Sequence, residues 1–586
     1  MLRVKSDKPG VGFLKRITPE TKTFLVFAVV CLLIKLALVS WRAIYAIPNG
    51  LSDDGLMQNT AVSLLDAHWM GGFNANTLSK RNIFSFYLAF NNAFGIPLLI
   101  ANEILYFVAI LIIVFLMKKY TNKKWPLYIA FGLLFFNPAT FATATSVRIY
   151  RDAVFPSVIL ICLGSLFHVF TNIKDQKPFK GWSTLYMASL TVFWFLREES
   201  IWILPIISIC SLIAIMFAVK RKNKKYTKKT ILGLILAPLL SILVVGFGFK
   251  ILNFVVYGSF AVTEDQTSGY QNFYNAVGKI NSDERTDTVD FSTDIRYKIY
   301  SVSPTFKTIE DEMENAVFPA IKIHGGDPEE INSGWTTWAV RWAMAEKGYY
   351  GNAKTANEFY EKVASEINVA CDEGKIECTN QKPGLTKVIM SNIPRITEET
   401  FSNLQFAYTF SGTEVKQYYS EPEPPVLGEI SENLTNENIL FHSVGAQENP
   451  NDLLHYTLVD KIKIKILSGI KKAYQVLSPV LFWVAIGALA ILSVKYLFAT
   501  KDGKKFYQRP QFNLIVFSFS ILAALLIRCL IVAYLNISAF YATSDLYLYA
   551  CYSLVLAFDV MVLFLAISGI RVKIHREVKR DESKRK

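Results

Sequence analysis

The chain has 586 residues, of which 52% are hydrophobic and 14% are aromatic. This composition excludes an ordinary soluble protein and is typical of a protein with many membrane spans. The formal net charge of +14 raises nucleic acid as a partner. The positive charge lies in short loops between apolar segments, however, and this distribution argues against nucleic acid.

Ten apolar segments are predicted as membrane spans, each of which needs about 20 residues. In chain order they are residues 23–43, 98–117, 125–145, 153–171, 182–196, 200–219, 230–252, 473–498, 512–535 and 545–569. The first follows a basic start and has no small-residue cleavage site, so we interpret it as a retained span. The prediction is a mainly α-helical, polytopic membrane bundle of about ten spans.

The distribution of Lys and Arg predicts how the bundle is oriented. Basic loops at 118–124, 174–180, 220–229 and 501–509 fall on the same face as both termini, and the positive-inside rule makes this face cytoplasmic. The predicted divisions are a basic cytoplasmic N-terminus (1–22), seven spans with their outer loops (23–255), an extracytoplasmic domain with a juxtamembrane segment (256–472), three spans (473–570) and a basic cytoplasmic tail (571–586).

The polar region between spans seven and eight is predicted to be a mainly helical extracytoplasmic domain. After Asn352, apolar residues recur at spacings of three and four as far as Gly374, which is the pattern of a capped amphipathic helix. Cys371 and Cys378 lie at the end of this helix and of the turn that follows it, and in an oxidising exterior we expect them to form a disulfide. Two free thiols are the alternative.

Two segments near the end of this region carry their own predictions. "SEPEPPVLGE" (420–429) is predicted to be an extended loop, because its prolines disfavour regular structure. Residues 459–473 contain five lysines on the predicted outer side. We expect this stretch to lie as an amphipathic segment on the outer leaflet, where anionic headgroups would attract it.

Charged residues gather in three short loops that the predicted topology places on the outer face. The first loop holds Asp53, Asp54 and Lys80, the next holds Arg148, Arg151 and Asp152, and the third holds Arg197, Glu198 and Glu199. A carboxylate beside a cleft can take a proton from an acceptor hydroxyl, and cations can hold the charge of a leaving phosphate. The pattern favours group transfer from a phosphate-linked donor.

Simpler interpretations exist for single members of this set. Arg and Lys near span ends commonly extend to lipid headgroups, which is the interpretation we favour for Arg81. Asp54 could instead cap a helix that starts at Gly55.

Three ionisable residues lie deeper in predicted spans. Lys35 and Asp559 are expected about 18 Å and about 15 Å above the cytoplasmic edge, and we hypothesise that they form a pair, because unpaired charges in a membrane are costly. Arg528 is expected in the outer third of span nine, within reach of a lipid phosphate, or else extending to the headgroups.

The sequence contains no Walker A motif, no dinucleotide glycine fingerprint and no His-x-x-x-His pair. Its six histidines do not cluster, which argues against an imidazole zinc site. The sequence therefore requires no cofactor and assigns no metal ligand. Clustered carboxylates could still hold a divalent cation such as Mg²⁺ or Mn²⁺.

Several motifs occur in a recognisable order. "SDDGLM" comes directly after the first span, and "TLSKRNIFSFYLAF" comes later in the same loop. "SVRIYRDAVFP" supplies an acidic residue in the next outer loop. This order resembles the glycosyltransferase C superfamily of integral membrane enzymes, and within it the bacterial protein mannosyltransferase and lipid A aminoarabinose transferase branch. That branch has two prolines after the lysine, where this chain has Asn82 and Ile83. "FLREESIWILP" and "GWTTWAVRWAMAEKGYY" also look like poorly characterised bacterial membrane proteins of this type.

The resemblance implies an inverting sugar transfer from a polyprenyl-phosphate donor to a cell-envelope glycan or glycolipid, on the extracytoplasmic face of a bacterial cell membrane. It also implies two surface helices in the first outer loop, expected at about 55–69 and 82–95. The implied roles are a general base (Asp54 or Asp53), donor phosphate binding (Lys80, Arg148, Arg151 and Arg528) and substrate binding (Asp152, Arg197, Glu198 and Glu199). The partners would be the lipid-linked sugar donor, the acceptor and membrane lipids.

Two other functions remain open. A transporter or flippase of a lipid-linked saccharide would also need outer charges, but it should show two similar halves, and none is found. A non-catalytic envelope assembly protein would use its exterior domain as the working part.

Overall fold

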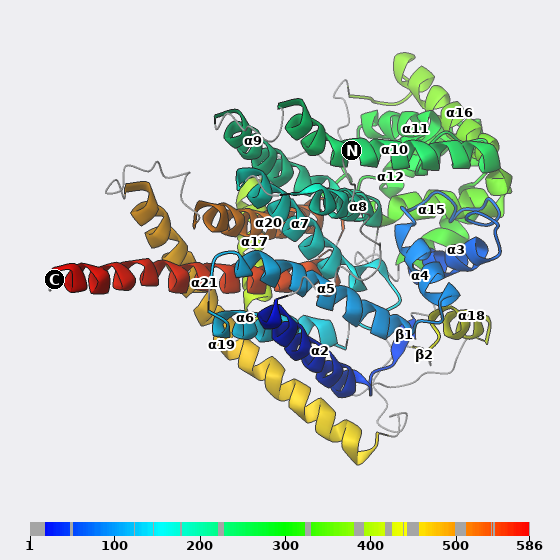
Figure 1. Ribbon diagram of the computed structural model, residues 1–586. Helices are drawn as coiled ribbons and strands as arrows, with labels where there is room; N and C mark the ends of the chain where they lie inside the picture. The colour runs from blue at the N-terminus through cyan, green and yellow to red at the C-terminus, as the bar shows by residue number, and fades with distance from the viewer. Residues whose placement is uncertain are drawn as a thin grey trace, which may run out of the picture.

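The computed structural model describes residues 18–46, 51–121, 123–143, 146–175, 178–220, 228–322, 330–379, 392–415, 425–437, 439–441, 456–498, 511–540, 542 and 545–584. In these ranges the chain is mainly helical (Figure 1). Within the described ranges, seven helices are long and apolar enough to cross a membrane. They are α2 (Pro19–Val39), α5 (Leu98–Lys118), α7 (Phe155–Lys174), α10 (Lys228–Tyr257), α19 (Leu458–Phe498), α20 (Gln511–Ser538) and α21 (Asp545–Lys584). They make the chain a multi-pass membrane protein.

The other three predicted spans are also helices, but shorter ones. α6 (Trp125–Phe135) has 11 residues, and α8 (Lys180–Leu196) and α9 (Leu204–Lys220) have 17 each. α6 ends early because Pro138 opens a 3-10 turn, η2 (Pro138–Phe141), and the Asn137 side chain accepts a hydrogen bond from the Ala139 amide. The count of ten spans and the cytoplasmic position of both termini stay predictions.

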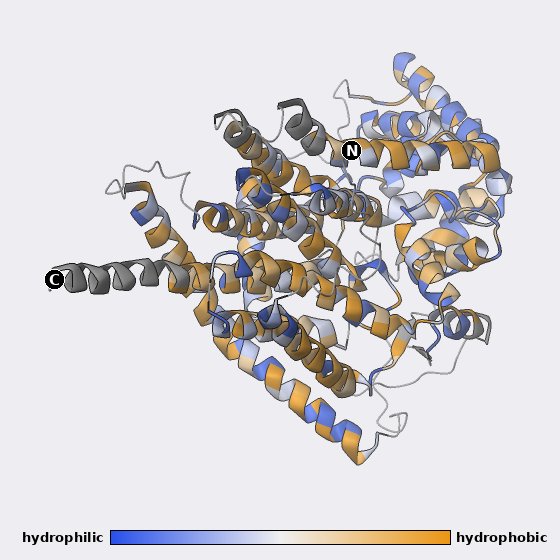
Figure 2. Ribbon diagram, viewed as in Figure 1, coloured by the Kyte–Doolittle hydropathy of each residue, from blue (hydrophilic) through white to orange (hydrophobic). Residues whose placement is uncertain are grey.

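The bundle is built around α7, in which every residue is buried. α7 packs against α5, α8, α9 and α21, so it lies in the middle of the membrane-spanning part. α10 instead leaves apolar side chains such as Val244 and Val255 at least 70% exposed, as expected for a helix that faces lipid. Figure 2 shows the apolar bundle and the more hydrophilic group of helices at one end of it.

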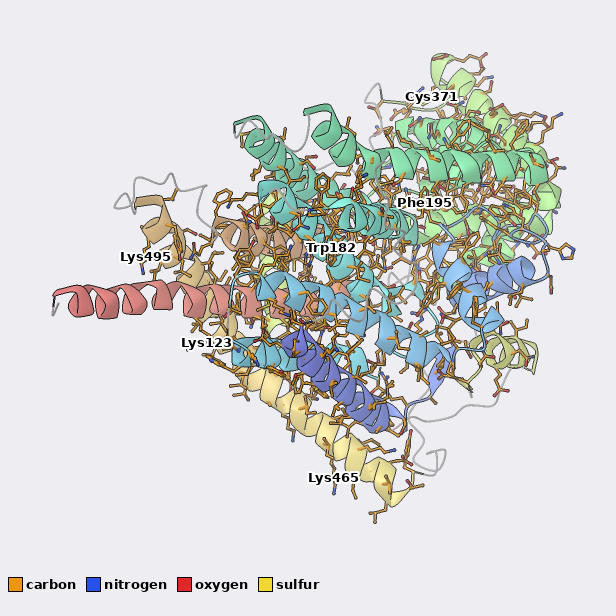
Figure 3. All side chains as sticks on the ribbon, viewed as in Figure 1. Lys123, Trp182, Phe195, Cys371, Lys465 and Lys495 are labelled. Carbon is orange, nitrogen blue, oxygen red and sulfur yellow. A yellow bond between two sulfur atoms is a disulfide. The ribbon has the colours of Figure 1, made fainter. Side chains whose placement is uncertain are left out.

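That hydrophilic group belongs to the region predicted to be extracytoplasmic, which we call the exterior domain, and it has a hydrophobic core of its own. Its helices are η5 (Glu264–Gln266), α11 (Ser268–Lys279), α12 (Thr293–Val302), α13 (Pro304–Lys307), η6 (Glu312–Val317), α14 (Phe318–Lys322), α15 (Ser333–Glu346), η7 (Tyr349–Gly351) and α16 (Ala353–Asp372). Phe73 and Ala75 of the first outer loop join this core. Figure 3 places Lys123 and Lys495 at the opposite end of the bundle from Cys371 of this domain.

The rest of the inserted region packs elsewhere. α17 (Ile393–Tyr408) lies against α20 and α21 of the bundle, and α18 (Pro425–Thr435) lies against α3 (Leu56–Leu65) and α4 (Ile83–Ala93). A parallel pair of short strands, β1 (Ile44–Ala46) and β2 (Ile439–Phe441), joins the end of the first span to the end of the insertion.

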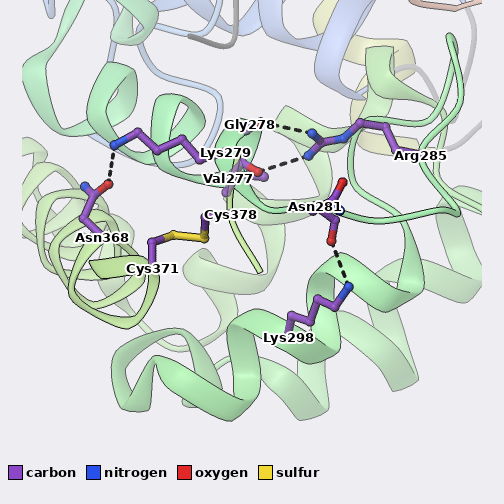
Figure 4. The surroundings of a disulfide bond; sticks show 9 residues. All are labelled: Val277, Gly278, Lys279, Asn281, Arg285, Lys298, Asn368, Cys371 and Cys378. Atoms are coloured by element: carbon purple, nitrogen blue, oxygen red, sulfur yellow. Dashed lines mark hydrogen bonds between the residues drawn. A yellow bond between two sulfur atoms is a disulfide. The ribbon is translucent and has the colours of Figure 1, made fainter. Parts of the chain in front are cut away.

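Two predictions in the exterior domain are matched by the structure. α16 begins after Asn352, whose side chain accepts a hydrogen bond from the Thr355 amide, and the chain leaves it through Gly374 at φ +70°. Cys371 and Cys378 form a disulfide with a Cα–Cα distance of 5.5 Å (Figure 4). The bridged loop lies against the end of α11, where the Thr379 amide donates to the Lys279 carbonyl.

Two other segment predictions were wrong. Of "SEPEPPVLGE", residues 425–429 open α18, because a proline is tolerated in the first turn of a helix; residues 420–424 lie outside the described part. The lysine-rich stretch 459–473 is not a separate surface segment but the first part of α19, which runs on through Pro479 as one helix of 41 residues.

Candidate functional site

The acidic pair lies in a π-helical turn, η1 (Leu51–Gly55), directly before α3. Asp54 is fully buried, and Arg148 binds its carboxylate with two nitrogens, Nη2 at 2.7 Å and Nε at 3.0 Å. The N-cap of α3 is Gly55, which provides no side-chain cap. A charged pair with this geometry is a strong, directional contact.

Asp53 faces a different partner and is more accessible. Its carboxylate pairs with Lys80 and accepts a hydrogen bond of 3.4 Å from the Tyr150 hydroxyl. The Asp53 side chain is 39% exposed. The two neighbouring carboxylates therefore hold two different cations from two different parts of the chain.

Tyr150 lies among three of the predicted cations. The centroid of its ring is 4.8 Å from the guanidinium of Arg148, 5.3 Å from that of Arg151 and 5.8 Å from the Lys80 ammonium. Such distances permit cation–π attraction. Burial raises the pKa of Tyr150 to about 12, so the phenol stays protonated. Our sequence reasoning did not select Tyr150, although an aromatic residue flanked by arginines in "VRIYRD" is a usable signal.

The third outer loop completes the cluster through η4 (Glu198–Ile203) and the preceding Arg197. Arg151 pairs with Glu198 at 2.8 Å, while Arg197 pairs with Asp152 and with Glu199. Arg528 of α20 reaches the same Glu199 carboxylate at 3.0 Å. We call the following set the outer charge network, after the outer loops that the sequence predicts: Asp53, Asp54, Lys80, Arg148, Arg151, Asp152, Arg197, Glu198, Glu199 and Arg528.

The structure thus brings together every charged residue that the sequence placed in the candidate site, including Arg528 from a distant helix. Two polar atoms inside this network have no hydrogen-bond partner among the described residues: the Arg151 Nε and the Asp152 Oδ2. Buried polar atoms without a partner are costly. Similar atoms occur elsewhere in the described part of the chain, for example at Gln58 and Asp559, so these two do not by themselves identify a ligand site.

The charged groups of the network shift one another's pKa values. Burial alone would raise the pKa of Glu198 and of Glu199, but the adjacent arginines outweigh it, so both values lie below the usual range. For Lys80, burial is the main cause of a pKa well below normal, and the charge of Arg151 acts in the same direction. Glu198 and Glu199 are therefore fixed as anions, and Lys80 gives up its proton more easily than an exposed lysine.

Arg81 does not extend to lipid headgroups, so that interpretation was wrong. Its guanidinium donates to the backbone carbonyls of Trp194 and Arg197, and its own amide donates to Glu198 at 3.0 Å. The carbonyls at the end of α8 lack helical partners and accept these bonds. Arg81 therefore ties the first outer loop to the third.

The exterior domain covers the network from one side. Trp338 of α15 lies 5.5 Å from the Lys80 ammonium. One turn further on, Arg341 donates to the Thr77 carbonyl at 2.8 Å and pairs with Glu264 at 3.3 Å. The Glu264 amide in turn donates to the Leu78 carbonyl at 2.8 Å. These contacts fix the loop that carries Lys80. Trp338 and Arg341 lie in the motif "GWTTWAVRWAMAEKGYY", but no role was assigned to them or to Glu264 from the sequence.

The proposed pair of Lys35 and Asp559 was wrong. The Lys35 ammonium lies 2.8 Å from Glu103 and donates to the Thr140 hydroxyl and the Phe135 carbonyl. Arg42 binds the other oxygen of the same carboxylate at 2.9 Å. Two of these acceptors, the Phe135 carbonyl and the Thr140 hydroxyl, lie at and just after the early end of α6. In a continuous helix the Phe135 carbonyl would instead accept a hydrogen bond within the helix. Neither carboxylate oxygen of Asp559 has a hydrogen-bond partner among the described residues.

Among the described residues there is no group of three or more His, Cys, Asp or Glu side chains that could hold a metal ion. Comparison with known proteins adds no family: no protein-family model matches the chain, and no curated protein matches it significantly.

Proposed function

We propose that the protein is a membrane glycosyltransferase that moves a sugar from a polyprenyl-phosphate donor to a cell-envelope acceptor, with inversion, on the outer face of a bacterial membrane. The observation that supports this proposal is the outer charge network, in which three short loops and α20 bring lysine and arginine side chains next to carboxylates. The exterior domain beside it supplies a surface for an acceptor.

In this mechanism Asp54 accepts the proton of the acceptor hydroxyl while that oxygen attacks the anomeric carbon. The bond from the anomeric carbon to the phosphate oxygen breaks, and the lipid phosphate leaves as an anion. Arg148 and Lys80 pair with Asp54 and Asp53, Arg151 lies beside the same Tyr150 ring, and these three cations would hold that phosphate. Arg148 would exchange Asp54 for the donor phosphate, so donor binding itself would free the base.

One observation favours a second candidate function, that of a non-catalytic envelope assembly protein. Asp54 is fully buried in its pair with Arg148, which suits a structural contact as well as a base held ready. No observation among the described residues favours the flippase alternative.

The test is a complementation experiment in a strain that lacks the gene. Asp54→Asn, Asp53→Asn and Asp559→Asn are expressed at equal levels, and the sugars of the envelope are quantified by mass spectrometry. We expect the deletion and Asp54→Asn to lose one sugar, and Asp559→Asn, a buried acid outside the network, to keep it. Full glycosylation by Asp54→Asn would exclude it as the base, and an unchanged glycan in the deletion strain would exclude the function.

A further inference from the structure

A groove opens on the exterior domain, away from the outer charge network, between α13, η7 and the first half of α16. Its volume is about 310 Å³, at the lower end of the roughly 300–1,000 Å³ typical of small-molecule sites. The side chains that define it are Thr308, Tyr349, Thr355, Glu358, Phe359 and Lys362. Nothing in the proposed transfer chemistry uses this groove.

The floor of the groove is aromatic and rigid. The ring centroids of Tyr349 and Phe359 lie 4.5 Å apart. Phe359 is only 3% exposed and belongs to the domain core, while the Tyr349 hydroxyl is held by a 2.9 Å hydrogen bond with Thr308. An aromatic surface that is already fixed loses little entropy when a ligand packs on it.

The rim of the groove is polar and carries both signs of charge. The hydroxyls of Thr308 and Thr355 can donate and accept hydrogen bonds, and Glu358 and Lys362 stand one turn apart on α16. Lys362 has no ion-pair or hydrogen-bond partner within the described ranges, whereas Glu358 lies 3.7 Å from Lys354. A single cation beside a carboxylate does not suit a phosphate, and the polar rim does not suit a lipid chain.

An aromatic floor with a rim of donors and acceptors matches one ligand class well. A pyranose ring offers apolar C–H groups on one face and hydroxyls around its edge, so it can pack on Tyr349 and bond with the rim. We propose that this groove binds a saccharide unit of the acceptor. The inference rests on the proposed glycosyltransferase function and adds to it a place where the acceptor is held.

The groove is fixed relative to the loop that carries Lys80. Tyr349 faces the groove, and the next residue, Tyr350, donates its hydroxyl to Glu264 at 2.8 Å. Glu264 belongs to the buried contacts with Arg341, Thr77 and Leu78 described above. A saccharide in the groove is thereby held by the same rigid body that positions Lys80.

The experiment uses the full chain in lipid nanodiscs and measures binding of two probes, maltotriose and chitotriose, by saturation-transfer difference NMR. We expect saturable binding of at least one trisaccharide, weakened tenfold or more by Tyr349→Ala. Lys362→Ala should weaken the same binding without affecting folding, because its side chain is exposed. Tyr297→Ala, an exposed tyrosine outside the groove, is the matched control and should bind like the wild type.

Lack of saturable binding of both probes would overturn the inference, as would undiminished binding by both Tyr349→Ala and Lys362→Ala. The Asp54→Asn chain separates this result from the proposed function. It should bind the trisaccharide normally while losing transfer, and loss of transfer without any trisaccharide binding would remove the groove but leave the glycosyltransferase proposal intact.

Discussion

Arg148 and Asp54 are 94 residues apart in the chain, yet they form a two-pronged ion pair in which the carboxylate is fully buried. The Arg148 side chain is only 12% exposed. A buried pair of this kind adds little net stability over an apolar pair of the same shape, but it is expensive to break from one side.

The first prediction concerns the cost of removing only one partner of this ion pair. Arg148→Ala leaves the Asp54 carboxylate buried without its main cation, and we expect a loss of about 3–5 kcal/mol in unfolding free energy. Arg148→Lys keeps the charge but cannot bind both oxygens in the same plane, so its loss should be smaller. Thermal unfolding in detergent measures both.

The double variant Asp54→Leu/Arg148→Met is the control for this prediction. Because it removes both charges together, it should recover most of the stability that Arg148→Ala loses. If Arg148→Ala unfolds at the wild-type temperature, the pair does not hold the first outer loop in place.

The second prediction compares two buried acids of the bundle. Glu103 binds both Lys35 and Arg42, so Glu103→Gln leaves two neighbouring cations without their shared anion. We expect this variant to lose more stability than Lys35→Met, after which Glu103 still has Arg42.

Asp559→Asn is the matched substitution for Glu103→Gln. Its carboxylate oxygens have no hydrogen-bond partner in the described part of the chain, so replacing the acid by its amide should cost nothing or slightly stabilise the protein. Equal losses for Glu103→Gln and Asp559→Asn in thermal unfolding would contradict this ranking.

The third prediction is a pH dependence that comes from Glu437. Its carboxylate accepts a 2.7 Å hydrogen bond from the Leu99 amide at the start of α5, and burial raises its pKa from 4.5 to about 7. The folded state therefore holds this proton more tightly than the unfolded state does. The resulting stability is fully present below pH 4.5 and is lost as the pH rises to about 7.

Thermal unfolding across this pH range tests the assignment. The wild type should lose stability between pH 4.5 and about pH 7, and Glu437→Gln, which keeps an oxygen to accept the Leu99 hydrogen bond, should lose less. A steeper loss in Glu437→Gln would show that other groups dominate the titration.

The sequence was sufficient to place the outer charge network as a set. Short loops on one side of a helical bundle must meet near the membrane surface, so the gathering of Asp54, Arg148 and Glu198 follows from the order of the spans. Which residue pairs with which inside the network could not be predicted from the sequence, because the pairing depends on how each helix is rotated about its axis. A sequence fixes the depth of a residue in a span far better than its direction.

Lys35 illustrates the same limit. Its depth was compatible with Asp559, but its side chain points towards α5 and the end of α6, where Glu103 and Phe135 lie. Glu103 was overlooked because one acid in the first turns of an apolar helix resembles a span-end residue. Contacts made by the exterior domain, such as that of Trp338 with Lys80, could not be predicted from the sequence, because no local pattern indicates which face of α15 packs against the bundle.

The contact between Arg528 and Glu199 spans 329 residues of chain, and the strand pair of β1 and β2 joins residues that are even farther apart, such as Ile44 and Ile439. If the chain inserts into the membrane from its N-terminus, the first spans and their outer loops are therefore in place before α20 is synthesised and can contact them. Among the described residues, Arg197 is the ion-pair partner that Glu199 has during that interval. The network is consequently one of the last parts of the protein to assemble during biosynthesis, and a chain truncated before α20 would reach the membrane without ever completing it.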